Sequence, residues 1–133
     1  MVKMQAIDPG WSWDEKIPLE QGLKVGNLLF LSGQVALDAD GHIVGKADLG
    51  AQTRQVFTNI GTLLVAAGAD FHNVVKLTTF FTVDITDLER LQPYFDVRRE
   101  FFGTHKPTST GVQITALIYP ELMLEVEAVA VLG

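Results

Sequence analysis

Apolar and polar residues occur in short alternating blocks along this chain, and the blocks predict strands and helices in a definite order. The run LLFLSGQ at residues 28–34 is typical of a buried strand that ends in small polar residues. A weaker strand is predicted before it at 19–25, and a strand rich in β-branched and aromatic residues at 74–83. Two further strands are predicted at the C-terminus, one after Pro107 and one after Glu121.

One long segment, residues 48–67, has the spacing of an amphipathic helix. Asp48 is placed to cap its start, and Gly68 is placed to end it in a left-handed conformation. The apolar face is predicted to carry Leu49, Val56, Ile60, Leu63, Leu64 and Ala67. The solvent face is predicted to carry Gln52, Arg54, Gln55 and Asn59.

A second helix is predicted before Gly103, but the pattern leaves its start open. Thr86 and Glu89 have the spacing of a capping box, which places the start at Thr86. Pro93 would then lie inside the helix, where it removes a hydrogen bond and clashes with the preceding turn. Either a short first turn stands apart, or the main helix begins near Pro93.

The order β-β-α-β-α-β-β predicts an α+β fold with two helices on one face of a mostly antiparallel sheet. We expect one domain over residues 1–133, because no linker or repeat divides the chain. Residues 1–17 show no clear periodicity and form an N-terminal extension, whose Trp11 and Trp13 we expect to cover the protein body or a neighbouring subunit. The other sheet face keeps several large apolar residues, which favours oligomerisation.

Composition narrows the class of protein. The chain has 133 residues, of which 47% are hydrophobic and 20% charged, and this suits a folded domain. Its net charge of −6 argues against binding the nucleic-acid backbone, and the lack of cysteine excludes disulfides and thiolate chemistry. No apolar run approaches the roughly 20 residues that span a bilayer, and no signal peptide is recognised. We therefore expect a cytoplasmic protein without membrane contact.

Two carboxylates in the last strand are the first candidates for chemistry. Glu125 and Glu127 are two residues apart and point to the same face of a strand. They form either a reactive pair beside a polar loop or the solvent face of the strand. Ser32 and Gly33 either offer a hydroxyl and backbone N–H groups to a ligand or simply end a strand. No metal site is expected, because two carboxylates have no nearby histidine and His42, His72 and His105 are scattered.

Several segments together resemble the RidA (YjgF/YER057c/UK114) family over residues 19–131. The matching segments are LLFLSGQ at 28–34, QTRQVFTNI at 52–60, AGA at 67–69, VVK at 74–76, FF at 101–102 and EVEAVA at 125–130. The resemblance implies a chorismate-mutase-like fold and a homotrimer with a central barrel and three clefts between subunits. It also implies hydrolysis of reactive enamines and imines to a carbonyl compound and ammonia, without a cofactor or metal.

The site that this family implies is only partly present. Where the catalytic subgroup of the family has Pro-Ala-Arg, this chain has Pro107, Thr108 and Ser109, so the arginine that grips the substrate carboxylate is absent. Leu19 stands at the position of a cleft tyrosine, and the cleft asparagine corresponds to Gln92 or Phe95. The resemblance implies Glu125 as the residue that orients the attacking water. The substrate-binding positions that it implies are Leu19, Ser32, Gly33, Ser109, Thr110 and Gly111.

Three functions follow from this partial match. The first is an imine or enamine deaminase with an altered substrate bound in the cleft between subunits. The second is a non-catalytic trimer that binds a small molecule or regulates a partner. The third is the endoribonuclease or translation inhibitor that some family members are called, although the acidic charge disfavours it. Arg98 and Arg99 lie on the second predicted helix. Either one of them reaches the cleft, or both face solvent.

Overall fold

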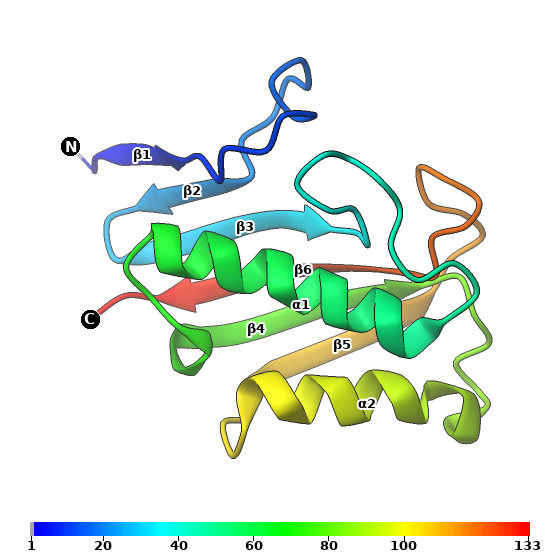
Figure 1. Ribbon diagram of the computed structural model, residues 1–133. Coiled ribbons are helices and arrows are strands. Elements are labelled where there is room, and N and C mark those ends of the chain that lie inside the picture. The colour runs from blue at the N-terminus through cyan, green and yellow to red at the C-terminus, as the bar shows by residue number, and fades with distance from the viewer. Residues whose placement is uncertain (1) are drawn as a thin grey trace.

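The computed structural model describes residues 2–133, so Met1 of the predicted extension lies outside it. Within this range two long helices cover one face of a single sheet (Figure 1), which confirms the predicted α+β fold. The strands are β1 (Met4–Ile7), β2 (Gly22–Val25), β3 (Leu28–Gln34), β4 (Val74–Phe81), β5 (Thr108–Gln113) and β6 (Leu124–Val131). The helices are α1 (Leu49–Ala66), α2 (Leu88–Phe102) and a 3₁₀ turn at Phe71–Asn73. None of the helices in residues 2–133 has the length and apolar character needed to cross a membrane.

The sheet has the strand order β1-β2-β3-β6-β4-β5, so the C-terminal strand lies in its middle. All neighbouring strands are antiparallel except β4 and β5, which are parallel. In β6, Leu124, Val126 and Ala128 are buried under the helices, while Glu125 and Glu127 point to the opposite face. We call this uncovered side the outer face.

Strand β1 was not predicted. It pairs with β2 from Met4 opposite Val25 to Ile7 opposite Gly22, and of its four residues only Ile7 is buried. Because a strand at the sheet edge is held mainly by backbone hydrogen bonds, it needs no alternating apolar pattern. The chain then turns so that Trp11, 6% exposed, enters the core, and the ring of Trp13 stacks on it at 5.8 Å. The two tryptophans therefore cover the body of the same chain.

Helix α1 follows its prediction at both ends. The carboxylate of Asp48 accepts a hydrogen bond from the N–H of Ala51 at 3.0 Å, and Gly68 adopts a φ of +77° just past the end. The predicted solvent face is wrong at two positions, because Gln52 is fully buried and Asn59 is 4% exposed.

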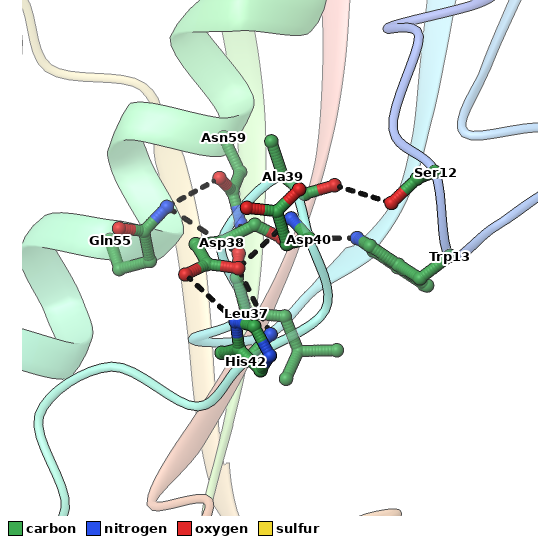
Figure 2. A network of polar contacts seen from close by, with 9 residues as sticks. All are labelled: Ser12, Trp13, Leu37, Asp38, Ala39, Asp40, His42, Gln55 and Asn59. Carbon is green, nitrogen blue, oxygen red and sulfur yellow. Dashed lines mark hydrogen bonds and ion pairs between the residues drawn. The ribbon is translucent and has the colours of Figure 1, made fainter.

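Both buried amides tie α1 to loops that approach the sheet. Gln52 accepts from the N–H of Met123 and donates to the carbonyl of Glu121, each at 2.8 Å. Asn59 donates to the carbonyl of Leu37 at 2.9 Å, as Figure 2 shows. These hydrogen bonds offset the free-energy cost of burying the two polar side chains. A prediction from hydrophobic periodicity does not include such bonds and therefore places both residues in solvent.

Helix α2 runs without a break from Leu88 through Pro93, so both predicted alternatives for its start are wrong. Its cap is Asp87, whose carboxylate accepts from the N–H of Arg90 at 3.2 Å. Thr86 instead donates its hydroxyl to Asp84 at 2.7 Å. A proline this close to the helix start removes one backbone hydrogen bond, and the burial of Leu91 and Tyr94 on either side of it offsets that loss.

Candidate functional site

Ser32 and Gly33 form a bulge in β3. Leu31 lies opposite Ala128 and Gln34 opposite Val126, so two residues of β3 face only Glu127 of β6. The N–H of Ser32 donates to the carbonyl of Gln21 at 2.9 Å. Its hydroxyl donates to the carbonyl of Glu20 at 2.7 Å, which leaves the hydroxyl oxygen able to accept. The bulge is thereby held against the segment that leads into β2.

Gly33 lies directly under the carboxylate of Glu125. A Cβ atom added at Gly33 would overlap Oε1 of Glu125 and approach its Cδ to 2.7 Å. The glycine therefore serves close packing, one of the two readings of the sequence, and what it packs against is the carboxylate of Glu125.

The position of Glu125 changes its acidity. Its side chain is partly buried, and burial raises its pKa above the usual range, with the negative charge of Glu127 adding to the effect. Glu127 is exposed on the same outer face, as the two-residue spacing predicts. A carboxylate with a raised pKa exchanges protons closer to neutral pH, which suits general acid–base chemistry.

Four of the predicted site residues line one cavity of about 340 Å³, namely Leu19, Ser32, Gly33 and Glu125. The other lining residues are Trp13, Ile17, Gln21, Val35, Leu37, Ile118 and Tyr119. Sequence reasoning missed Tyr119, whose phenol comes from the loop between β5 and β6. Only the folding of that loop onto β3 brings it to Glu125, and no motif in the sequence signals this.

The predicted residues of β5 lie elsewhere in the chain. Ser109 pairs with Leu77 and Gly111 with Thr79, so both are on the helix side of the sheet. They line a second cavity, of about 220 Å³, with Phe95 and Arg98. Thr110 alternates to the outer face opposite Thr78. Within one chain, Ser109 and Gly111 therefore lie on the opposite face of the sheet from Glu125.

Arg98 contacts Ser109, the residue that stands where the family resemblance implies an arginine. Its Nη1 donates to Oγ of Ser109 at 2.9 Å and to the hydroxyl of Tyr94 at 3.3 Å. Arg99 is exposed and pairs with Asp96 at 3.4 Å. Of the two sequence alternatives for these arginines, Arg98 thus lies at the cavity and Arg99 on the exposed surface.

The two candidates for the cleft asparagine also separate in space. Phe95 lines the cavity that contains Ser109 and Gly111. Gln92 is exposed and donates to Asp96 at 2.8 Å. Of the two candidates, the apolar ring of Phe95 is therefore the one next to Ser109.

The histidines are less scattered than expected, because the rings of His72 and His105 lie 5.8 Å apart. His105 Nε2 is bonded to the carbonyl of Val74 at 2.6 Å, which ties the end of α2 to β4. His72 is exposed and lies 3.5 Å from Asp70. The pair thus connects two chain segments on the surface, away from Glu125.

Asp38, Asp40 and His42 are the one group of possible metal ligands found within residues 2–133, with ligand atoms within 4.8 Å of one another. One carboxylate oxygen of Asp38 accepts from the N–H groups of Asp40 and His42, each at 2.9 Å. The bond from His42 is the main reason that the pKa of Asp38 is lowered. Trp13 donates its indole N–H to the carbonyl of Asp38 at 3.1 Å, as Figure 2 shows. Hydrogen bonds within the protein account for the conformation of this loop.

These features define a small α+β protein with a carboxylate over a strand bulge and a guanidinium at the sheet edge. The family model described as Endoribonuclease L-PSP matches residues 14–132. The chain belongs to this family, the RidA (YjgF/YER057c/UK114) family that its motifs resemble.

Three relatives place the chain within the family. It is 36% identical to the 2-iminobutanoate/2-iminopropanoate deaminase of Bos taurus over 117 residues, 87% of this chain and 81% of that one. It is 35% identical to a RutC family protein of Pyrococcus horikoshii, over 85% of this chain and 86% of that one. The crystal structure of Escherichia coli TdcF with bound serine matches with a TM-score of 0.83 and 31% identity, covering 97% of this chain and 99% of that one.

Proposed function

We propose that this protein hydrolyses a reactive imine or enamine to a carbonyl compound and ammonia. The observation that carries the proposal is the partly buried Glu125, whose carboxylate with raised pKa is held over the Ser32–Gly33 bulge. The Bos taurus relative is named as a deaminase of 2-iminobutanoate and 2-iminopropanoate, and this name supports the same class of reaction here.

In the proposed reaction Glu125 acts as the base toward water. The substrate reacts as the protonated imine: water loses a proton to the carboxylate while its oxygen forms a bond to the iminium carbon, and the C=N electron pair moves to nitrogen. Glu125 then returns the proton to the –NH2 group, which becomes –NH3⁺. The C–N bond breaks and ammonia leaves with its electron pair, while an oxygen lone pair forms the C=O bond and the hydroxyl proton passes to the carboxylate of Glu125 or to water. An enamine enters the same sequence after its carbon takes up a proton.

The cavity around Glu125 supplies groups that orient the substrate. Ser32 has its hydroxyl proton on the carbonyl of Glu20, so its oxygen is directed to accept from an iminium N–H. Tyr119 adds a phenol to the same cavity, where Leu19 provides none. Positioning of the reactants in this way lowers the barrier by reducing the entropy lost in the reaction.

We propose that a second copy of the chain completes this cleft with its Ser109 and Gly111, within a homotrimer. The outer face exposes large apolar side chains that two helices leave uncovered: Leu28, Phe30, Val112 and Val131. Strand β5 is an open sheet edge, and all six of its residues are exposed. An uncovered apolar face and a free strand edge both favour burial against another copy.

The test is release of ammonia from imines that an amino-acid oxidase produces in situ, with and without the protein. Wild-type protein is expected to accelerate release, and Glu125→Gln is expected to lose the acceleration by about 10²- to 10⁴-fold. No acceleration over several side-chain types, while a relative with the family arginine works in the same assay, would overturn the proposal.

A second candidate is a trimer that binds a small molecule without turnover. Serine at position 109 and leucine at 19 favour it, because the cleft then lacks two polar groups of the family site. This candidate predicts a rise in Tm with ligand and no release of ammonia above background. A rate that disappears in Glu125→Gln would exclude it.

A further inference from the structure

We propose that Arg98 and Ser109 form an anion-binding subsite that takes a carboxylate of the substrate. The inference rests on the proposed function and deepens it, because it makes the substrate a carboxylate-bearing imine in place of a neutral one. The guanidinium enters the site from helix α2, whereas the family arginine enters from strand β5.

The hydrogen bonds of Arg98 leave part of its guanidinium available. Nη1 donates to two neutral oxygens, the hydroxyls of Ser109 and Tyr94. Within residues 2–133 no hydrogen-bond partner is found for Nη2 or Nε. A guanidinium carries five N–H donors in a planar fork, so the edge that remains has the geometry that a carboxylate accepts bidentately.

The charge of Arg98 is also unbalanced locally. Arg54 lies 2.6 Å from Glu100 and Arg99 lies 3.4 Å from Asp96. Arg98 is partly buried, yet no carboxylate in the described part of the chain comes within 4.0 Å of it. Withdrawing a cation from water without a counter-ion is costly, so a bound anion would stabilise this arrangement.

The surroundings of Arg98 suit a small anion with an apolar body. The guanidinium carbon lies 6.0 Å from the ring centre of Tyr94 and 5.9 Å from that of Phe102. Cavities of about 340 and 220 Å³ adjoin Arg98, and neither is lined by an aspartate or glutamate. Phe95 lines both cavities, and Lys106 lines the larger one. This is a local basic, apolar environment in a chain whose net charge is −6.

Ser109 gives the subsite its second donor. Because its oxygen accepts from Arg98, its own hydroxyl proton is directed away from the guanidinium. A carboxylate placed against the free edge of Arg98 would therefore receive guanidinium N–H groups and the Ser109 O–H. The serine that replaces the family arginine thus contributes to the same task.

The test compares a carboxylate with its neutral amide as probes for the assembled protein. Binding of 2-oxobutanoate and 2-oxobutanamide is measured by calorimetry for wild type, Arg98→Gln, Arg98→Lys and the control Arg90→Gln. Arg90 is exposed on the same helix and lines neither cavity. Wild type is expected to prefer the carboxylate, and Arg98→Gln to lose about ten- to hundredfold of that preference. Arg98→Lys should keep part of it, and Arg90→Gln all of it.

A variant that restores a guanidinium to the subsite distinguishes lost anion binding from a general structural effect of Arg98→Gln. Adding Ser109→Arg to Arg98→Gln should recover the preference for the carboxylate, because a guanidinium then enters the same place from β5. The ratio of the two affinities is insensitive to a uniform loss of folded protein. An unchanged ratio in Arg98→Gln, or no preference in wild type, would overturn the proposal. The ammonia-release assay tests the proposed deaminase activity separately. If the preference for the carboxylate depends on Arg98 but no imine is hydrolysed, the subsite is supported and the deaminase activity is rejected.

Discussion

The Cα atom of Gly33 lies directly against the carboxylate of Glu125. A methyl group at position 33 would occupy space that Oε1 and Cδ of Glu125 now fill. The two residues come from neighbouring strands, β3 and β6, and are brought together by the bulge that starts at Ser32. The place of the proposed base therefore depends on the absence of a side chain from another strand.

Gly33→Ala is expected to lower the rate of imine hydrolysis about ten- to hundredfold, because it displaces the carboxylate of Glu125. The backbone of Gly33 does not need a positive φ, and the displaced atoms are the end of a flexible side chain. The free energy of unfolding should therefore stay within about 1 kcal/mol of wild type. Steady-state kinetics and urea denaturation together check both expectations.

Gly68→Ala is the matched control. Gly68 has a φ of +77° and no atom within 4 Å of an added Cβ, so its substitution strains the backbone without touching the site. We expect a loss of about 1 kcal/mol in stability and an unchanged rate. A rate loss in Gly68→Ala as large as in Gly33→Ala would show that global stability, and not the placement of Glu125, limits the reaction.

Glu127→Gln is expected to move the acid limb of the rate profile to lower pH. The negative charge of Glu127 helps to raise the pKa of Glu125, and removing it lets the base ionise at lower pH. The movement should be partial, because burial is the larger cause and remains. An acid limb that stays in place, or moves to higher pH, would mean that Glu125 is not the titrating base.

Glu125→Gln should stabilise the protein at neutral pH. The folded-state pKa of Glu125 is raised, so the folded chain binds this proton more tightly than the unfolded chain. Its stabilising contribution is full below the unfolded pKa and is lost as pH rises through the folded pKa. The Tm of the variant minus that of wild type should thus be larger at about pH 7 than at about pH 3.5. An equal difference at both pH values would contradict the raised pKa.

Local pattern was sufficient for most of the fold. Strand β3 and helix α1 with its Asp48 cap were predicted because their apolar periods are long and clean. Strand β1 was missed because only Ile7 of its four residues is buried. Buried Gln52 was assigned to solvent, since its partners Glu121 and Met123 lie about 70 residues away in sequence. Hydrogen bonds between residues so far apart in sequence cannot be predicted from the local sequence pattern.

The candidate site was predictable residue by residue but not as an arrangement. The sequence indicated Ser32, Gly33 and Glu125, and the structure brings these three together. It gave no sign of Tyr119, whose loop has no regular pattern. The sequence also left open whether Arg98 reaches the cleft or faces solvent, because the direction of a long side chain depends on how α2 packs over β5. The opposite orientations of Ser109 and Glu125 follow from strand register, which the pattern did not determine.

Pro93→Ala should raise the free energy of unfolding by about 1 to 2 kcal/mol. Pro93 cannot donate to the carbonyl of Glu89, one turn earlier in α2, and an alanine can. Because Pro93 is exposed, the substitution removes little packing. Urea denaturation measures the gain, and the rate of imine hydrolysis should not change. A loss of stability would show that the ring fixes the entry of α2 more than it disturbs the helix.

Mixing two impaired variants tests whether the cleft is shared between copies. Glu125 and the Arg98–Ser109 subsite lie on opposite faces of one sheet, so in the proposed oligomer each cleft takes one half from each of two chains. Glu125→Gln and Arg98→Gln should each be impaired alone, the second mainly at low substrate concentration. Refolded together, they should form hybrid oligomers in which about one cleft in four has both intact halves.

The regained activity should follow the fraction of hybrid oligomers, which two different affinity tags isolate and light scattering sizes. The control is a mixture of Glu125→Gln with Gly33→Ala, since both lesions lie in the same half. In that mixture every chain carries one of the two lesions, so no cleft contains an intact Glu125 half. The control should therefore stay at the level of its better component. Activity in the first mixture and not in the second requires Glu125 and Arg98 to meet across an interface, whereas hybrids that stay inactive would confine the site to one chain.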